Sequence, residues 1–326
     1  KTFLRMTFER FSKVVPRENI IVVTAEKYRD LVMENIPELE QKNLLLEPYS
    51  RNTAPCVAYA NYTILHRNPE ARVVVTPSDH VIIDEDLFVD TIAKAFEYVV
   101  EKDVLMALGV PPTRPDCNYG YVQACGGREA IAKGEPVQVK TFTEKPDKTI
   151  AKILIDSGEF LWNSGIFIWN IRTIAQELEK YLPDIANQFK DIVPFYYTIE
   201  EAAYIKGIYE GCNGISIDYG VMEKTSCSWV FETSFGWSDV GTWESLYHLG
   251  QKDENENLLS VGDSLIDKVE GSIIVSSEED KLVVVKGLKD YMVINTDDVL
   301  LVCPRDSVRF KNVITDLTLN EFDKYQ

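Results

Sequence analysis

Short apolar runs, each followed by a helical pattern, are the feature that most constrains how this chain folds. Four such runs lie at residues 20–24, 44–46, 72–76 and 104–109, and none alternates polar with apolar residues. Strands that are buried on both faces have this kind of sequence. From Leu87 to Val100, apolar residues recur at three- and four-residue steps, which predicts an amphipathic helix. Repeated strand–helix–strand order predicts an α/β, Rossmann-like domain with a mostly parallel central sheet.

The pattern changes after a polar segment at residues 251–257. Beyond it, four short apolar runs follow one another at nearly regular spacing, at 273–275, 282–285, 291–294 and 299–302. Such spacing predicts a small β-rich C-terminal domain, built either as a short left-handed β-helix-like stack of coils or as a stack of hairpins. We therefore expect two domains, residues 1–250 and residues 251–326.

The charge balance limits the possible partners. There are 34 Lys and Arg residues against 52 Asp and Glu residues, a net charge of −18, which argues against nucleic acid and anionic membranes as partners. No apolar run approaches the roughly 18 residues that a membrane span needs. A small anionic substrate remains possible, because salt confines the field of surface charges to about 10 Å. The six cysteines form no C-x-x-C pair, which excludes a zinc or redox motif and favours a cytoplasmic protein.

Candidate chemistry follows the strands, because ligands of open α/β sheets bind beyond the carboxyl ends of the strands. Asp79 lies in the motif T-P-S-D-H at 76–80, and Asp239 lies in G-W-S-D-V-G-T-W at 236–243. Each has a structural alternative as a helix cap or a turn residue. Two carboxylates about 4 Å apart repel by roughly 4 kcal/mol at an effective dielectric near 20, and Mg²⁺ would reverse this repulsion. If the two aspartates meet, they predict a magnesium site.

Five further positions have residue types suited to a phosphorylated sugar. Lys145 can hold a phosphate while the adjacent Glu144 accepts from a hydroxyl, although an exposed ion pair is the alternative. Asn163 can both donate to and accept from vicinal hydroxyls, with a turn residue as the alternative. Gly120, between two tyrosines, would let a ligand approach the backbone closely. Asp218 ends an apolar segment, with a helix cap as its alternative.

Together these motifs resemble the mannose-1-phosphate guanylyltransferases, a family of nucleotidyltransferases. The resemblance spans nearly all of the chain to about residue 302, and it rests on seven strings that run in the family's order: E-P-x-x-R-N-T-A-P at 47–55, T-P-S-D-H at 76–80, T-R-P…Y-G-Y at 113–121, F-T-E-K-P at 142–146, W-N-S-G at 162–165, S-I-D-Y-G-V-M-E-K at 216–224 and G-W-S-D-V-G-T-W at 236–243.

The resemblance implies a role for each matching position. Asp79 and Asp239 would hold the catalytic Mg²⁺, and Lys145 would meet the sugar phosphate, so these three residues would be catalytic. The nucleotide would lie against Glu47, Arg51, Asn52, Thr53 and Ser78. The sugar phosphate would contact Gly120, Glu144, Lys145, Asn163 and Asp218.

One part of the family pattern has no match. The family opens with a strand and a loop of the form G-G-x-G-x-R-L-W-P followed by a Pro-Lys pair, and no stretch of this chain is similar to it. Thr2 to Phe11 resembles the helix that follows that loop. We therefore expect the complete protein to have an upstream segment, and the residues that cradle the triphosphate are not assigned.

The implied reaction is transfer of a guanylyl group from GTP to mannose 1-phosphate, which gives GDP-mannose and pyrophosphate by a Mg²⁺-dependent in-line attack. The same resemblance implies a homo-oligomer, with a dimer as the expected form. Two alternatives remain at this point. One is a catalytically silent sensor that binds GDP-mannose, and the other is a pyrophosphorylase for another hexose 1-phosphate or another nucleoside triphosphate.

Overall fold

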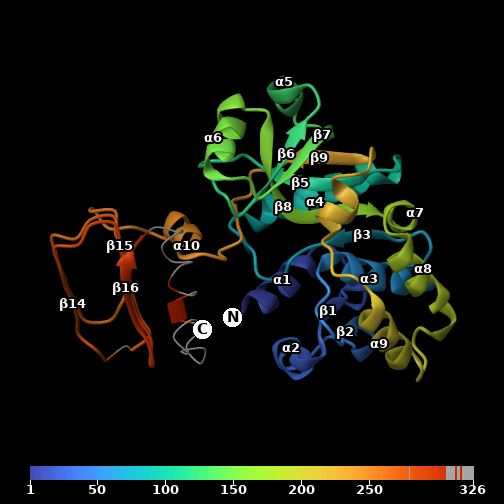
Figure 1. Cartoon of the computed structure of the whole chain (residues 1–326), viewed down its shortest axis with the longest axis horizontal. Coiled ribbons are helices and arrows are strands. Elements are labelled where there is room, and N and C mark those ends of the chain that lie inside the picture. The colour runs from blue at the N-terminus through green and yellow to red at the C-terminus, as the bar shows by residue number, and fades with distance from the viewer. Residues whose placement is uncertain (279, 306–312, 314–315, 318–326) are drawn as a thin grey trace. The chain divides into compact units, whose positions relative to one another are not determined.

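A computed structural model describes residues 1–278, 280–305, 313 and 316–317 (Figure 1). The chain divides into two compact units, Lys1–Trp237 and Ser238–Gln326. The division falls before helix α10 (Trp243–Leu249), whereas the predicted boundary falls after it. Tyr247 of this helix packs with Leu258 and Ile273, which explains why α10 groups with the C-terminal strands.

The first part of unit 1 alternates helices and strands as predicted. The elements are α1 (Phe3–Phe11), β1 (Val22–Ala25), α2 (Arg29–Asn35), β2 (Leu44–Glu47), α3 (Thr53–Arg67), β3 (Arg72–Val75), β4 (Val81–Ile82) and α4 (Glu85–Val100). Thr2 caps α1, since its side chain accepts from the Arg5 N–H, and Asp84 caps α4 in the same way. β1 and β2 pair in parallel as a separate two-stranded sheet. The α/β class is therefore confirmed.

A six-stranded sheet forms the centre of unit 1. Its strand order is β3-β8-β5-β9-β7-β6, with β5 (Leu105–Val110), β6 (Gly120–Ala124), β7 (Val137–Glu144), β8 (Phe160–Asn170) and β9 (Ser228–Glu232). Of its described pairings, β5 with β9 is parallel, and the others are antiparallel.

The prediction of a mostly parallel sheet is therefore wrong. Between β6 and β7 the chain has the five-residue helix α5 (Gly127–Ile131), and these strands pair antiparallel, whereas parallel neighbours need a longer crossover. Helix α6 (Lys148–Ser157) then leads into β8, which runs antiparallel between β3 and β5. Among the strands before residue 110, β1 and β2 are parallel neighbours as predicted, whereas the antiparallel β8 between β3 and β5 makes the central sheet mixed.

Helices cover both faces of this sheet. On one side, Phe88, Ile92, Ala95 and Val99 of α4 are fully buried, which confirms the predicted apolar stripe. On the other side, α3 packs with α7 (Ile171–Tyr181), α8 (Pro183–Asp191) and α9 (Glu201–Gly211).

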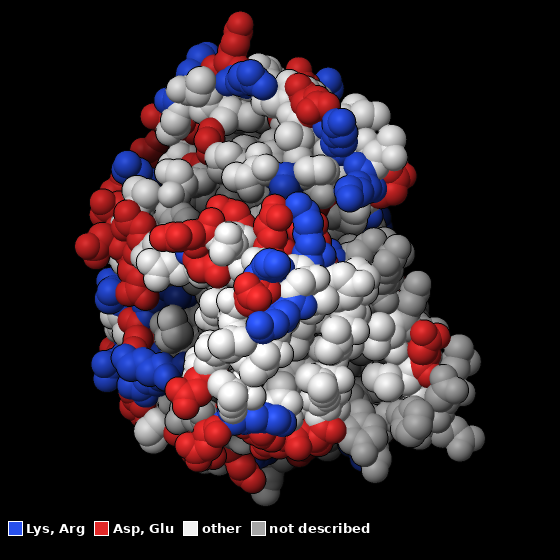
Figure 2. Space-filling view, turned by 90° about the vertical axis from the view of Figure 1, so that its left-hand side faces the viewer, with Lys and Arg blue, Asp and Glu red and all other residues white. Residues whose placement is uncertain are grey.

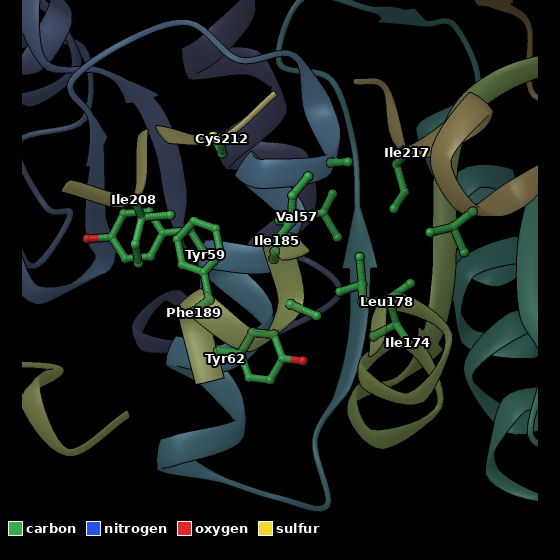
Figure 3. Close-up of a cluster of buried hydrophobic side chains, with 14 of the residues drawn as sticks. Val57, Tyr59, Tyr62, Ile174, Leu178, Ile185, Phe189, Ile208, Cys212 and Ile217 are labelled. Atoms are coloured by element: carbon green, nitrogen blue, oxygen red, sulfur yellow. The ribbon is translucent and has the colours of Figure 1, made fainter. Parts of the chain in front are cut away.

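Figure 3 shows the core on the α3 side. Val57, Tyr59 and Tyr62 of α3 lie among apolar side chains of α7, α8 and α9. Ile217 belongs to the same cluster and is 2% exposed. This burial anchors the segment that carries the neighbouring Asp218.

Unit 2 is β-rich, as predicted. It contains β10 (Trp237–Ser238, at the division), α10, β11 (Leu258–Ser260), β12 (Ser264–Asp267), β13 (Ile273–Ser276), β14 (Val283–Lys286), β15 (Tyr291–Asn295) and β16 (Leu300–Pro304). β11, β13 and β15 pair in parallel, and β12 pairs in parallel with β14. Successive strands thus alternate between two sheets, as in the coils of a solenoid, and β16 closes the larger sheet antiparallel to β15. The predicted domain extends to residue 326, and most of its residues beyond 305 lie outside the described residues.

Among the described residues, no helix combines the length and the apolar character needed to cross a membrane.

Candidate active site

The centre of the candidate site in unit 1 is a hydrogen bond between Asn163 and Asp218. The Asn163 side chain, on β8, donates from Nδ2 to Oδ1 of Asp218 at 2.8 Å. The same side chain accepts from the Gly165 N–H at 3.1 Å, and Gly165 has a φ of 72°, which favours glycine. Asn163 is therefore held within a strand rather than in a turn, with its amide aimed at the carboxylate.

Asp218 begins a short π-helical turn, η5 (Asp218–Met222), whose preceding residue is Ile217. π-Helical turns occur often at functional sites. Burial raises the pKa of Asp218, and the hydrogen bond from Asn163 lowers it in part. The carboxylate is half-buried, so it can face a ligand from one side while the protein holds the other side.

Gly120 and Glu144 lie next to Asn163 in the candidate site. They pair directly across β6 and β7, and a Cβ at Gly120 would lie 2.3 Å from Oε2 of Glu144 and 3.4 Å from Cβ of Asn163. Only a glycine leaves room for this carboxylate. The predicted close approach at Gly120 is thus filled by Glu144 in this structure.

Glu144 is an acidic side chain whose burial disfavours its charged form. It is 11% exposed, and Oε2 is buried with no hydrogen-bond partner among the described residues. Burial raises the pKa of Glu144, the nearby Asp218 charge raises it further, and Lys145 lowers it. A buried acceptor without a donor costs about 1–3 kcal/mol, so a ligand that supplies a donor here would recover that free energy.

Lys145 places an exposed cation next to Glu144. Its Nζ lies 3.4 Å from Oε1 of Glu144, and the side chain is 63% exposed. The backbone has a φ of 47°, and its N–H donates to the Tyr119 carbonyl at 3.2 Å. The ion pair between Lys145 and Glu144, which was the structural alternative for these residues, therefore exists. Its carboxylate is only 11% exposed, whereas the alternative was an exposed pair.

The loop predicted to bind the nucleotide lies against the Asp218 segment. Thr53 Oγ1 accepts from the Ile217 N–H at 2.8 Å, and the Ala54 N–H donates to the Ile215 carbonyl at 3.0 Å. Asn52 has a φ of 66°, and its side chain accepts from the Thr53 N–H at 2.8 Å. Two sets of residues predicted for different ligands are thus adjacent in unit 1.

Tyr209 supports two of the predicted nucleotide residues, and sequence reasoning missed it. Its hydroxyl donates to Oε1 of Glu47 at 2.9 Å, and its carbonyl accepts from Nε of Arg51 at 2.8 Å. Burial raises the pKa of Glu47, and the Tyr209 hydrogen bond lowers it. No local signal identified Tyr209, because it fits an ordinary apolar position of helix α9, 162 positions from Glu47.

Ser78 and Asp79 lie in an exposed loop just after β3. The Asp79 side chain is 72% exposed, with Oδ1 3.9 Å from Nε2 of His80. Nδ1 of His80 accepts from Nε1 of Trp237 at 3.0 Å, which holds the imidazole beside Asp79 in place. The Ser78 carbonyl accepts from Thr7 Oγ1 of α1 at 3.1 Å. Since Asp84 caps α4, Asp79 is not a helix cap.

Asp239 belongs to unit 2. Its Oδ1 accepts from the Gly241 N–H and from Ser245 Oγ, each at 3.3 Å. Thr242 caps α10, so Asp239 is a turn residue rather than the helix cap. Because Asp79 and Asp239 lie in different units, their meeting at one cation stays a prediction.

The donor chemistry fits a magnesium ion. Asp79 presents carboxylate oxygens toward solvent, and Mg²⁺ binds through one or two carboxylates together with water and substrate phosphate oxygens. Among the described residues, no group of three or more His, Cys, Asp or Glu side chains would hold a metal without such additional ligands. A cation here would depend on the phosphates of a substrate.

Comparisons with known proteins agree with these motifs. A family model described as nucleotidyl transferase matches residues 1–256. The chain is 36% identical to a mannose-1-phosphate guanylyltransferase of Escherichia coli, over 92% of this chain and 65% of that protein. It is 33% identical to one from Klebsiella pneumoniae, over 100% of this chain and 69% of that protein. The chain thus spans about two thirds of the length of these curated relatives.

Two solved structures are also similar. A Thermus thermophilus protein described as a mannose-1-phosphate geranyltransferase superposes with a TM-score of 0.83 at 29% identity, covering 98% of this chain and 90% of that one. A Helicobacter pylori mannose-6-phosphate isomerase gives a TM-score of 0.61 at 26% identity, covering 73% and 90%. These comparisons confirm the resemblance found in the sequence motifs.

Proposed function

Because the chain belongs to the nucleotidyl transferase family, we propose that it transfers a guanylyl group from GTP to mannose 1-phosphate. The products would be GDP-mannose and pyrophosphate. The names of the relatives support the choice of nucleotide and sugar. The chain spans about two thirds of the length of those proteins, and we propose the same activity for the complete protein.

The observation that carries the proposal is the group formed by Glu144, Asn163 and Asp218. It places one buried carboxylate oxygen, which has no donor in the described part of the chain, near a second carboxylate that already accepts a hydrogen bond from an amide. Carboxylates accept hydrogen bonds from hydroxyls, and an amide both donates and accepts. Vicinal hydroxyls of a hexose would satisfy this set, and Gly120 would leave room for the Glu144 carboxylate that receives them.

In the proposed reaction one substrate attacks the other directly, and no covalent intermediate with the protein is needed. A phosphate oxygen of mannose 1-phosphate attacks the α-phosphorus of GTP, and the bond to the departing pyrophosphate breaks. The attacking oxygen is already an anion, so no general base is needed, and the task is to align two polyanions. We assign Lys145 to the sugar phosphate, where its ammonium would offset the added negative charge.

The nucleotide would lie along the loop that begins at Glu47. Arg51, Asn52 and Thr53 would line its pocket together with Glu47 and Ser78. The contact between Thr53 and Ile217 supports this assignment, because it brings the loop next to the proposed sugar site at Asp218. The Tyr209 hydrogen bonds would fix the two charged members of the loop.

Members of this family generally use a divalent metal ion, and we propose Mg²⁺ for this chain. Asp79 and Asp239 would be its protein ligands. When bound, the ion would supply positive charge to the phosphates that approach each other.

A pyrophosphate-release assay on the complete protein tests the function. Four nucleoside triphosphates are each combined with mannose 1-phosphate, glucose 1-phosphate and other hexose 1-phosphates. We expect the highest kcat/KM for GTP with mannose 1-phosphate. Tight GDP-mannose binding without turnover would identify the sensor instead, and a preference for another pair would identify a different pyrophosphorylase.

We also propose a homodimer. On the face in Figure 2, basic and acidic side chains lie above, to the left of and below an area of mostly uncharged side chains. Among the described residues of unit 2, Leu265 and Val284 pair across β12 and β14 and are 48% and 54% exposed. Burying such side chains is the usual reason for assembly. Light scattering after size exclusion measures the mass, and a monomer at micromolar concentration would contradict the dimer.

The coils of unit 2 would wind left-handed, which a crystal structure would test directly. A cytoplasmic location is supported by the six cysteines, all of which are free thiols.

A further inference from the structure

The proposed function assigns no role to Arg114, although this residue lies in the T-R-P motif that precedes Gly120. Nη2 of Arg114 donates to Oδ2 of Asp116 at 2.8 Å. The Asp116 side chain is buried, and that of Arg114 is half-buried. A pair with a buried partner is costly to break, because the remaining charge is left without a counter-ion. The guanidinium is therefore held in one place.

Two aromatic rings lie against this guanidinium. Its Cζ atom is 5.2 Å from the centre of the Trp162 ring and 5.8 Å from the centre of the Tyr119 ring. The two rings also meet edge to face, with 4.9 Å between their centres. Both side chains are buried. A cation close to an aromatic face gains about 0.5–2 kcal/mol, so Arg114 stabilises both rings in their present positions.

Each ring belongs to a neighbour of the proposed sugar site. Trp162 directly precedes Asn163 in β8, and Tyr119 directly precedes Gly120. The Tyr119 carbonyl also accepts from the Lys145 N–H at 3.2 Å. Because a closely packed interior transmits displacements, a shift of either ring would move the backbone that carries these groups.

We propose that Arg114 is a positioning residue, which acts through the two rings to fix the backbone at which Asn163 and Gly120 meet the sugar phosphate. This role rests on the proposed function, because it concerns the same sugar site. Binding groups work only when they are held to within about 0.5 Å of the productive geometry. Loss of Arg114 should therefore weaken binding of the sugar phosphate and leave the nucleotide loop unaffected.

Direct contact with the phosphate is the alternative role for Arg114, since a guanidinium binds phosphate as it binds a carboxylate. Replacing Asp116 separates the two roles. If Arg114 positions the rings, Asp116→Asn should weaken sugar binding, because the arginine loses the partner that holds it. If Arg114 binds the phosphate, the same change should maintain or improve binding, because a donor of the guanidinium becomes available.

Steady-state kinetics on the complete protein test the proposal, with mannose 1-phosphate and GTP varied in turn. We expect Arg114→Ala and Asp116→Asn each to raise the KM for mannose 1-phosphate about fivefold or more, and the KM for GTP by less than about twofold. The double variant should have the KM of Arg114→Ala, because both changes remove the same interaction. An unchanged KM for mannose 1-phosphate in Asp116→Asn would overturn the positioning role.

Arg5→Ala is the matched control. Arg5 also pairs with a carboxylate, that of Glu38 at 2.7 Å, and its Cζ lies 5.8 Å from the centre of the Phe8 ring. Its side chain is 25% exposed, against 21% for Arg114. Arg5 lies in α1, outside the proposed sugar site, so its loss should leave the KM for mannose 1-phosphate unchanged. A lower Tm with an unchanged KM in the Arg114 variant would mean that Arg114 only stabilises its loop.

Fluorine NMR gives a second readout, which needs no substrate. The protein is labelled with 5-fluorotryptophan, and Trp162→Phe identifies the signal of Trp162. This signal should shift in Arg114→Ala and in Asp116→Asn, and it should stay in place in Arg5→Ala. An unchanged Trp162 signal in the first two variants would overturn the proposal.

The kinetics also separate this role from the proposed function. A wild-type protein that turns over no hexose 1-phosphate would contradict the proposed function and the positioning role with it. An active wild type whose KM for mannose 1-phosphate is shared by the Arg114 and Asp116 variants would contradict the positioning role alone.

Discussion

Asn163 donates a hydrogen bond of 2.8 Å to Asp218, although 55 positions separate them in the chain. One residue lies in the long strand β8 and the other begins the turn η5. The bond therefore ties the sheet to the segment that also contacts the Thr53 loop. This arrangement holds one oxygen of a half-buried carboxylate in place, and we propose that the other oxygen accepts from the sugar.

Replacing Asn163 by alanine should damage binding more than folding. Asp218 would lose its donor, and its pKa would rise further because the hydrogen bond now lowers it. We expect the KM for mannose 1-phosphate to rise about tenfold, since a hydrogen bond to a charged group contributes about 1.5–3 kcal/mol. Asn170→Ala, at the other end of β8, breaks a bond to the Val99 carbonyl and serves as the control. Equal KM values in both variants would remove Asn163 from the sugar site.

Gly120→Ala should separate activity from stability. The new Cβ would lie 2.3 Å from Oε2 of Glu144, so the end of that flexible side chain must move. We expect kcat/KM to fall ~10- to 100-fold, because a misplaced binding group is costly, while Tm changes little. Gly207→Ala in α9 meets no atom within 4 Å and should stabilise the protein by about 0.5–1 kcal/mol without loss of activity. Full activity of Gly120→Ala would show that the Glu144 position is not critical.

Lys145→Ala should raise the KM for mannose 1-phosphate about tenfold and the KM for GTP much less, because the lost charge is assigned to the sugar phosphate. Lys140→Ala, an exposed change on β7, the strand that ends just before Lys145, is the matched control. Steady-state kinetics with each substrate varied in turn give both constants. Equal increases for the two substrates would place Lys145 away from the sugar end.

The sequence was sufficient where one element determines the outcome. The stripe at Phe88, Ile92 and Val99 predicted α4 and its buried face, because helical periodicity is local. The valine run of β3 likewise predicted a strand. Residues that end these elements, such as Asp79, were correctly placed in a loop beyond a strand.

The sequence was insufficient where distant segments decide the outcome. Nothing in the sequence of β8 reveals that it runs antiparallel between β3 and β5, because strand direction depends on partners that are far away in the chain. The support that Tyr209 gives to Glu47 was missed for the same reason. Glu144 was predicted as a sugar contact, but its burial against Gly120 became visible only with the register of β6 and β7.

Glu144→Gln should change how stability depends on pH. Burial raises the pKa of Glu144 above its unfolded value, so the folded state holds the proton more tightly than the unfolded state. The stabilisation from this proton is complete below the unfolded pKa near 4, and it is lost as the pH rises through the folded pKa. The neutral glutamine avoids that loss, so its free energy of unfolding should exceed that of the wild type by about 1 kcal/mol around pH 7.

Urea denaturation at several pH values measures this difference, which should shrink toward zero below about pH 4. Glu135→Gln, at an exposed position, should show no such trend. A constant difference across the pH range would mean that the ionisation of Glu144 does not limit stability.

Asp79→Asn and Asp239→Asn test the proposed magnesium ligands. Each change keeps the shape of the side chain and removes a negative charge that the cation requires. We expect turnover to fall by at least ~10²-fold, comparable to the loss of one electrostatic stabiliser, and the Mg²⁺ concentration for half-maximal rate to rise.

Asp86→Asn, an exposed change in the first turn of α4, is the control for lost charge. Tm should stay near that of the wild type in the Asp79 and Asp86 variants, because both side chains are exposed. The Tm of the Asp239 variant measures how much its hydrogen bonds with Gly241 and Ser245 contribute to stability. Unchanged Mg²⁺-dependent turnover in both site variants would refute the metal assignment, and a loss confined to one of them would leave that aspartate as the sole protein ligand.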